Sequence, residues 1–330
     1  MITTVATDPL PSWRPGAVKE ALLAFVAAVS SEGSDRFVPE AERVAVFDND
    51  GTLWPEQPLP FQAAFAFDEL KGAVQRKPEL ASDPMVQAAL AGDIGALLAG
   101  DHFDGLLRVI AVSHAGMTTE AFAAAVEAWL GSARHPQLQR PYDALTYGPM
   151  QEVLALLRAH HFRSFIVSGG GADFMRVWVE RVYGIPPERV VGSTGRTHFE
   201  LRDGAPVLVK SLDTLFVNDG AGKPAGIHQF IGRRPLMAFG NSDGDLAMLQ
   251  YTTVGNPRPA LGVIVHHTAA DREYAYDAHP RGTGRLVEAL AEAPRRGWTV
   301  VDMRRDWARV FAADPDPAGS RDTMSRAPAP

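Results

Sequence analysis

The sequence predicts an α/β protein with a doubly wound, mostly parallel sheet that is interrupted by a long helical insertion. After residue 141, short apolar runs alternate with helical segments, which is typical of a sheet with helices on both faces. Three apolar runs end in polar, glycine-containing loops that begin at Asp48, Ser168 and Asn241. Between the first two loops, residues 61–131 follow a helical pattern and contain no strand-like run.

The first half of the chain should contain one helix, one strand and the insertion. Apolar residues at helical spacing predict an amphipathic helix at Ala17–Val29. The β-branched run Arg43–Phe47 stops at a polar loop, as a buried strand does. Several short helices are expected in the insertion, and the last apolar face there should end at Gly131.

The second half should alternate between helices and strands and include one hairpin. The dipeptide Asp203-Gly204 favours a tight turn, so we expect Thr197–Leu201 to pair with Pro206–Lys210. The other elements are predicted from apolar periodicity and from the polar loops between them. They are a helix at Met150–Ala159, a strand at Phe162–Val167, a turn at Ser168–Gly171, helices at Asp173–Tyr183 and Pro224–Phe230, a strand at Pro235–Phe239, a helix at Leu246–Leu249 and a strand at Leu261–Val265.

The composition excludes several classes of function. The 330 residues are enough for about two domains, and the 46% hydrophobic and 22% charged residues are typical of globular proteins. The absence of cysteine excludes disulfides, zinc–thiolate sites, iron–sulfur clusters and cysteine nucleophiles. A net charge of −7 argues against nucleic acid or an anionic membrane surface as the main partner.

The first residues of the sequence do not resemble a targeting signal. Residues 1–15 lack a basic leader and a continuous apolar stretch, so we expect no signal peptide and a cytoplasmic protein. No segment reaches the roughly 18 apolar residues that a membrane span needs. Residues 313–330 are rich in proline without an apolar period, and we expect a disordered tail there.

The first polar loop carries Asp48 and Asp50 at the end of a strand. Carboxylates so close together can share a hard cation such as Mg²⁺. A solvated turn is the alternative, because Asp and Gly are common in turns. A calcium loop is excluded, since Val46 and Gln57 stand where its first Asp and last Glu belong.

The second polar loop, Ser168–Gly171, offers a hydroxyl and backbone N–H groups at the start of a helix. This arrangement suits an anion, although a tight turn has the same pattern. The spacing fits neither a nucleophile elbow nor a Walker A loop. Lys223 lies 18 residues before Asn241 at a predicted helix start, where it could neutralise a bound phosphate or lie in solvent.

Together, these loops resemble the four motifs of the haloacid dehalogenase superfamily, in the family's order. The matching segments are residues 46–53, residues 166–170, Lys223 and residues 240–246. The resemblance implies a Rossmann-like hydrolase core formed by residues 1–55 and 146–312. Residues 56–145 would form an all-helical cap, as in the phosphoserine phosphatase-like branch.

The resemblance also implies a Mg²⁺-dependent phosphatase that acts on a small phosphorylated metabolite. By position, Asp48 would attack phosphorus and form an aspartyl-phosphate, and Asp50 would be the general acid and base. Ser168 and the Gly169 N–H would hold phosphate oxygens, while Lys223 would balance their charge. The implied metal site consists of Asp48, the Asp50 carbonyl, Asn241 and Asp245.

The fourth motif departs from the family pattern, because Asn241 stands where the first metal carboxylate belongs. Asp243 is an extra carboxylate that could bind the metal instead, although we favour Asn241 with Asp245. Substrate specificity could come from Trp54 and Glu56, which could receive a cationic head group. In the alternative, Trp54 packs at the cap hinge and Glu56 lies in solvent.

Two other functions stay open. One is dehalogenation or phosphotransfer on the same scaffold, but dehalogenation requires neither Asp50 nor a metal, so the aspartate pair argues against it. The other is a non-catalytic protein that binds a phosphorylated ligand, motivated only by Asn241. We interpret His266 and His267 as structural residues or as residues that support the site from behind, and not as zinc ligands, because neighbouring side chains on a strand face opposite ways. No heptad run predicts an oligomeric state.

Overall fold

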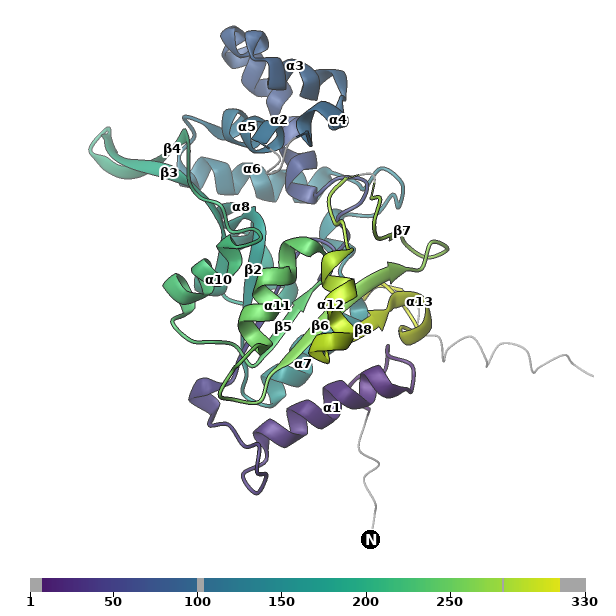
Figure 1. Cartoon of the computed structure of the whole chain (residues 1–330). Helices are drawn as coiled ribbons and strands as arrows, with labels where there is room; N and C mark the ends of the chain where they lie inside the picture. The colour runs from purple at the N-terminus through teal and green to yellow at the C-terminus, as the bar shows by residue number, and fades with distance from the viewer. Residues whose placement is uncertain (1–7, 100–103, 281, 315–330) are drawn as a thin grey trace, which may run out of the picture.

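The computed structural model describes residues 8–99, 104–280 and 282–314. A sheet lies at its centre, helices cover both faces of the sheet, and a further group of helices lies beyond one end (Figure 1). This arrangement confirms the predicted α/β class. In these described ranges, no helix combines the length and the apolar character needed to cross a membrane.

The described residues form one sheet of eight strands. The strands are Val44–Phe47 (β1), Arg163–Gly171 (β2), Val190–Arg202 (β3), Ala205–Phe216 (β4), Met237–Gly240 (β5), Leu261–Thr268 (β6), Ala275–Tyr276 (β7) and Thr299–Asp302 (β8). Their order is β4-β3-β2-β1-β5-β6-β7, with β8 paired to β6. Among these described strands, only β4 and β7 pair antiparallel to their neighbours. Strand β1 therefore lies between β2 and β5, in the middle of the parallel part.

Helices connect most of the parallel strands. The α-helices are Ala17–Ser30 (α1), Phe61–Arg76 (α2), Pro84–Ala91 (α3), Ile94–Leu97 (α4), Asp104–His114 (α5), Thr119–Ser132 (α6), Gly148–Ala159 (α7), Ala172–Arg176 (α8), Val179–Tyr183 (α9), Gly222–Gly226 (α10), Leu246–Thr253 (α11), Glu288–Arg296 (α12) and Met303–Asp306 (α13). Short 3₁₀ turns lie between several of them, and a π turn at Ile227–Ile231 continues α10.

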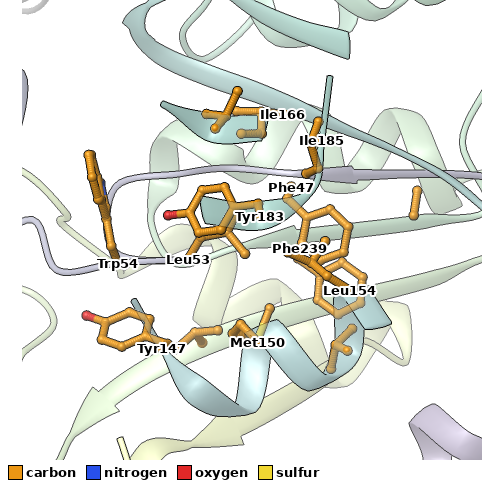
Figure 2. Packing of buried hydrophobic residues seen from close by; sticks show 14 of the residues in the cluster. Phe47, Leu53, Trp54, Tyr147, Met150, Leu154, Ile166, Tyr183, Ile185 and Phe239 are labelled. Atoms are coloured by element: carbon orange, nitrogen blue, oxygen red, sulfur yellow. The ribbon is translucent and has the colours of Figure 1, made fainter. Parts of the chain in front are cut away.

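Alternation along β1 explains why helices cover both faces of the sheet. Val44 and Val46 are buried in the cluster that includes α11 and α12. Ala45 and Phe47 are buried on the other face, in the cluster that includes α1 and α7. Phe47 stacks on Phe239 of β5 with ring centroids 4.4 Å apart, inside the core drawn in Figure 2. Because both faces are buried, the strand consists of a continuous apolar run.

Helices α2 to α6, which we call the helical insert, follow β1 and have a small core of their own. Leu70, Val86, Leu97 and Val109 are buried together there. As the sequence predicts, the described residues between 61 and 132 are helices and their connections. The chain boundaries at residues 55/56 and 145/146 stay a prediction.

The β3–β4 hairpin projects from the edge of the sheet and runs beside α5 and α6 (Figure 1). The hairpin turns at Asp203 and Gly204, as predicted, and these two residues have φ values of 52° and 79°. The hairpin also contacts the insert through the backbone, because the Lys210 N–H donates to Met117 O at 2.9 Å.

Three local predictions were wrong in detail. Residues 168–171 continue β2 instead of forming a turn, because Gly171 still pairs with Ser193 of β3 after a shift in register. The helix predicted at 173–183 is broken into α8 and α9 around Trp178, whose side chain is buried against Trp54. Helix α6 continues through Gly131 to Ser132. Of the tail predicted to be disordered, residues 315–330 lie outside the described residues.

Candidate active site

The carboxyl ends of β1, β2 and β5 meet at one edge of the sheet. Parallel pairing places Phe47 opposite Ile166 on one side and Phe239 on the other. The segments that follow these three residues carry the first, second and fourth motifs and therefore lie side by side. Ligands of open α/β sheets bind at such a point, where connections leave a central strand in opposite directions.

Lys223, at the start of α10, joins two carboxylates from different loops. Its Nζ donates to Asp48 Oδ1 at 2.8 Å and to Asp245 Oδ1 at 2.5 Å, and all three side chains are buried. Burial opposes the charged lysine, but Asp245 and Asp48 outweigh this effect and raise the pKa of Lys223. Burial also raises the pKa of Asp48, and the attraction of Lys223 offsets it only in part. The cluster thus holds more buried carboxylate than one ammonium neutralises.

Asp50 is held by an indole. Its Oδ1 accepts a hydrogen bond of 2.7 Å from Trp54 Nε1, and Trp54 stacks on Trp178 with ring centroids 4.1 Å apart. Its other oxygen faces the second-motif loop, since a Cβ built on Gly170 would lie 3.3 Å from Asp50 Oδ2. Burial raises the pKa of Asp50 to about 6, and the Trp54 hydrogen bond acts in the opposite direction. Such a carboxyl can both donate and accept a proton near neutral pH.

The second-motif segment, residues 168–171, is supported by two side chains that the sequence analysis missed. Asn218 Nδ2 donates to the Ser168 carbonyl at 3.0 Å, and Ser193 Oγ donates to the Gly169 carbonyl at 2.7 Å. The buried Ser168 Oγ itself accepts from the Gly170 N–H at 3.1 Å. One signal for Asn218 was available, because it begins a polar loop after a strand.

Gln62 on α2 extends from the helical insert to the second-motif segment. Its Oε1 accepts a hydrogen bond of 2.6 Å from the Gly171 N–H, and the side chain is buried. The insert therefore contacts the second-motif segment directly. Gln62 stands within a mostly apolar helix and gave no signal in the sequence.

Asn241 of the fourth motif is buried between Thr52 and Glu56. Thr52 Oγ1 donates to Asn241 Oδ1 at 2.9 Å, while Asn241 Nδ2 donates to Glu56 Oε1 at 2.6 Å. Glu56 also accepts from Tyr276 OH at 2.8 Å and from Thr283 Oγ1 at 2.6 Å. Burial raises the pKa of Glu56 to about 7, and these hydroxyl donors limit the rise.

The two acids of the fourth motif have separate partners. Asp245 Oδ2 accepts from the backbone N–H groups of Asn241 and Ser242 at 2.9 Å and 3.0 Å, so this carboxylate closes the loop on itself. Asp243 instead accepts from backbone N–H groups at the start of α12, including Glu288 at 2.8 Å. Asp243 therefore caps α12, whereas Asp245 anchors the loop to Lys223.

The predicted specificity residues lie inside the protein. Trp54 has 0% and Glu56 has 3% of its surface exposed. Trp54 packs on Phe61 at the start of the insert, with ring centroids 4.5 Å apart, which agrees with the alternative in which it packs at the hinge. Glu56 is bound to Asn241 and is not in solvent. A cationic head group would find neither side chain at the surface, so we do not retain that interpretation.

His267 supports the first-motif loop, in line with its interpretation as structural. Its Nε2 lies 2.7 Å from the Gly51 carbonyl oxygen, and its Nδ1 lies 3.1 Å from Glu273 Oε2. Burial opposes the charged imidazole, but Glu273 and Glu56 outweigh it and raise the pKa of His267. Gly51 has a φ of +80°, which favours glycine at this position.

The fold and the site define an α/β protein whose carboxylates, hydroxyl and lysine converge at the middle strand of a parallel sheet. The sequence model of the haloacid dehalogenase-like hydrolase family matches residues 45–250. The chain therefore belongs to the haloacid dehalogenase-like hydrolase family. No curated protein matches the sequence.

Solved structures extend the likeness of the fold beyond this range. A conserved functionally unknown protein from Anaerococcus prevotii covers 86% of this chain and 91% of its own, with a TM-score of 0.55 at 15% identity. A protein of unknown function from Bordetella pertussis covers 79% and 99%, with a TM-score of 0.45 at 19% identity. A phosphoserine phosphohydrolase-like protein from Francisella tularensis covers 77% and 98%, with a TM-score of 0.40 at 15% identity. The first of these shows that the fold is shared over most of the chain.

Proposed function

We propose that the protein is a Mg²⁺-dependent phosphatase that hydrolyses a small phosphomonoester through an aspartyl-phosphate on Asp48. The main support is the buried hydrogen bond of 2.8 Å between Lys223 and Asp48, at the point where three strand ends meet. This bond fixes one carboxylate oxygen and places a positive charge next to the proposed nucleophile. Family membership supplies the hydrolase class, and the phosphatase reaction is the step that we add.

In the proposed reaction, the Asp48 oxygen that Lys223 does not hold attacks phosphorus. A bond forms between that oxygen and phosphorus, the bond to the leaving oxygen breaks, and Asp50 gives its proton to the leaving group. Asp50 then takes a proton from the water that attacks the phosphoenzyme, which releases inorganic phosphate and restores Asp48. The Trp54 hydrogen bond supports this role because it leaves the second Asp50 oxygen facing Gly170 of the second-motif segment.

Phosphate oxygens would be held by the Ser168 hydroxyl and the Gly169 N–H. Ser168 Oγ accepts from the Gly170 N–H, which leaves its hydroxyl proton for a phosphate oxygen. The hydrogen bonds from Asn218 and Ser193 to the carbonyls of this segment keep the donors in place. Preorganised donors of this kind stabilise charge that develops in the transition state.

Mg²⁺ fits the charge of the site, since Asp48 and Asp245 share the single ammonium of Lys223 and Asp50 lies nearby. Asp48, the Asp50 carbonyl and the Asn241 amide would supply hard oxygen ligands. Asp245 would act by orienting this set, because its oxygens are bonded to Lys223 and to loop N–H groups. In the described part of the chain, no group of three or more His, Asp or Glu side chains is placed to hold a metal ion, and the proposed set accordingly includes a backbone carbonyl and an amide. When bound, the ion would neutralise charge on the phosphoryl group.

We assign the fourth-motif ligand to Asn241 and not to Asp243. The Asp243 carboxylate is occupied by Arg285 and by the first N–H groups of α12. Asn241 instead lies beside Thr52 of the first-motif loop, the loop that also carries Asp48. We also assign residues 56–145 as a cap over the site, supported by the Gln62 contact to the second-motif segment.

Turnover of an aryl phosphomonoester by the purified protein, with and without added Mg²⁺, tests this function. We expect hydrolysis that needs Mg²⁺ and falls by several orders of magnitude in Asp48→Asn. Asp213→Asn, an exposed change on the β3–β4 hairpin, is the matched control and should keep full activity. Mg²⁺-dependent hydrolysis that survives Asp48→Asn would contradict the assigned nucleophile, and release of halide without Mg²⁺ would support dehalogenation instead.

A further inference from the structure

Glu56 is a buried carboxylate whose partners include the amide of Asn241. Asn241 Nδ2 donates to Glu56 Oε1 at 2.6 Å, and hydroxyls of Tyr276 and Thr283 also donate to Glu56, at 2.8 Å and 2.6 Å. Both members of the pair are nearly inaccessible, with 3% and 1% of their surfaces exposed. A carboxylate buried this deeply needs such donors, so its position is closely fixed.

The pair determines which way the Asn241 amide faces. Its nitrogen points to Glu56 and its oxygen points to Thr52, which donates at 2.9 Å. The flipped amide would place an acceptor against the Glu56 carboxylate, so the observed orientation is strongly favoured. Accepting from the amide N–H also polarises the amide and makes its oxygen a better ligand for a cation.

The pair is packed onto the backbone beside Asp50. A Cβ built on Gly51 would lie 2.1 Å from Asn241 Nδ2 and 2.4 Å from Glu56 Oε1. A side chain there would therefore separate the two residues or displace the loop. The Gly51 carbonyl oxygen in turn lies 2.7 Å from His267 Nε2, so the backbone on which the pair packs is itself held in place.

We propose that Glu56 is a positioning residue of the cation site: it holds the Asn241 amide oxygen toward the first-motif loop and supplies the negative charge that the amide lacks. This inference rests on the proposed function, because it assigns Asn241 to the Mg²⁺ site. In this arrangement the neutral amide of Asn241 would contact the proposed ion, and the Glu56 carboxylate would lie on the nitrogen side of that amide. Replacing Asn241 by Asp would put two carboxylates at hydrogen-bond distance, so the two positions should depend on each other.

A charge-exchange experiment on the full chain tests this dependence. Mg²⁺ affinity is measured by titration calorimetry without substrate, and melting temperature by circular dichroism. The proteins are the wild type, Glu56→Gln, Asn241→Asp and the double variant. Glu56→Gln keeps an acceptor for the amide but removes the charge, and we expect Mg²⁺ binding about 10- to 100-fold weaker. Asn241→Asp should lower the melting temperature, because like charges then face each other.

The variant that combines both substitutions should recover both properties. In it, the glutamine amide that replaces Glu56 can donate to the carboxylate that replaces Asn241, and the pair again carries one negative charge. We expect its Mg²⁺ affinity to return to within a few-fold of the wild type. Glu152→Gln is the matched control: Glu152 is another largely buried glutamate with several donors, including Ser12 and Arg309, and it lies outside every motif. This control should bind Mg²⁺ like the wild type.

The outcomes separate this inference from the proposed function. Equal Mg²⁺ affinity in the wild type and Glu56→Gln, with a double variant that melts no higher than Asn241→Asp, would overturn the role of Glu56. The proposed Mg²⁺-dependent phosphatase activity would be unaffected by that result. Absence of both Mg²⁺ binding and phosphatase activity in the wild type would overturn the two together. If Glu56→Gln does not fold, Glu56→Asp keeps the charge but shortens the side chain by one carbon, which draws the carboxylate away from Asn241. Unchanged Mg²⁺ affinity there would also count against the inference.

Discussion

Lys223 donates a hydrogen bond of 2.5 Å to Asp245, and both side chains are enclosed by the protein. Asp245 in turn closes the fourth-motif loop, and Lys223 also donates to Asp48. One ammonium therefore connects the proposed nucleophile to the loop that is proposed to hold the metal. Lys223, which we propose to act at the phosphate, should therefore also be important for stability.

Removing the Lys223 ammonium should destabilise the protein strongly. Lys223→Met leaves two buried carboxylates without their common partner, and the expected loss is about 3–5 kcal/mol in the free energy of unfolding. Urea denaturation measures it. The control is Arg258→Met, which breaks the exposed pair with Glu42 and should cost about 1 kcal/mol or less. A Lys223→Met variant as stable as the control would contradict the assigned burial of this charge cluster.

The hydrogen bond from Trp54 should influence the pH range over which Asp50, the proposed general acid, is protonated. Its hydrogen bond stabilises ionised Asp50 and so lowers the pKa of a carboxyl that burial has raised to about 6. In Trp54→Phe this pKa should rise further, so that Asp50 stays protonated to higher pH. The basic limb of kcat/KM for an alkyl phosphomonoester, whose leaving group needs a proton, should then move to higher pH.

The matched control for this change is Trp178→Phe. Within the described residues the Trp178 indole N–H has no hydrogen-bond partner, although the ring packs on Trp54. This variant changes the packing but keeps the donor to Asp50, and its pH profile should match the wild type. Identical profiles for Trp54→Phe and the wild type would show that the indole does not tune Asp50.

Asp243→Ala should affect stability and not the metal. Asp243 accepts from backbone N–H groups at the start of α12, and loss of such a cap costs about 0.5–2 kcal/mol. We expect a lower melting temperature with Mg²⁺ affinity within a few-fold of the wild type, as measured by calorimetry. Loss of Mg²⁺ binding in Asp243→Ala, with retention in Asn241→Ala, would assign the ligand to Asp243.

His114 should make the protein less stable in acid. It is buried between Phe65 and Phe122, and burial, aided by Lys210, lowers its pKa to about 3. In the unfolded chain His114 takes up a proton as the pH falls below its ordinary pKa of 6.5, whereas in the folded chain it stays neutral. The contribution of the buried neutral imidazole to the free energy of unfolding is therefore complete above that pH and is lost as the pH falls. By about pH 5 the loss should reach about 2 kcal/mol, at about 1.4 kcal/mol per pH unit.

His114→Leu removes this titration, so its unfolding free energy should fall less between about pH 7.5 and about pH 5. Urea denaturation at the two pH values gives the comparison. Equal losses in the variant and the wild type would show that another group causes the acid sensitivity.

The parts of the site that depend on strand ends could be predicted from the sequence. Asp48, Ser168 and Asn241 each follow a short apolar run, and parallel pairing of β1 with both neighbours necessarily brings these ends to one edge. Lys223 was found through its spacing to the fourth motif and through the family resemblance.

Contacts between distant segments could not be predicted in this way. Glu56 and Asn241 are 185 residues apart, and no local pattern indicates which buried polar groups become partners. The same applies to Asn218, because its contact with the site is a hydrogen bond to the distant Ser168 carbonyl. The break between α8 and α9 also has a tertiary origin, because Trp178 packs on Trp54 from a different segment.

The proposed chemistry depends on a covalent bond between phosphorus and Asp48, and acid-quenched phosphoenzyme is its most direct test. The wild type, mixed rapidly with an excess of phosphomonoester and Mg²⁺, is quenched, digested and analysed by tandem mass spectrometry. We predict one added phosphoryl group on the peptide that contains Asp48, absent from Asp48→Asn and from samples without Mg²⁺. Turnover with no phosphoryl group on that peptide, or with the group on another residue, would contradict the assignment of Asp48 as the nucleophile.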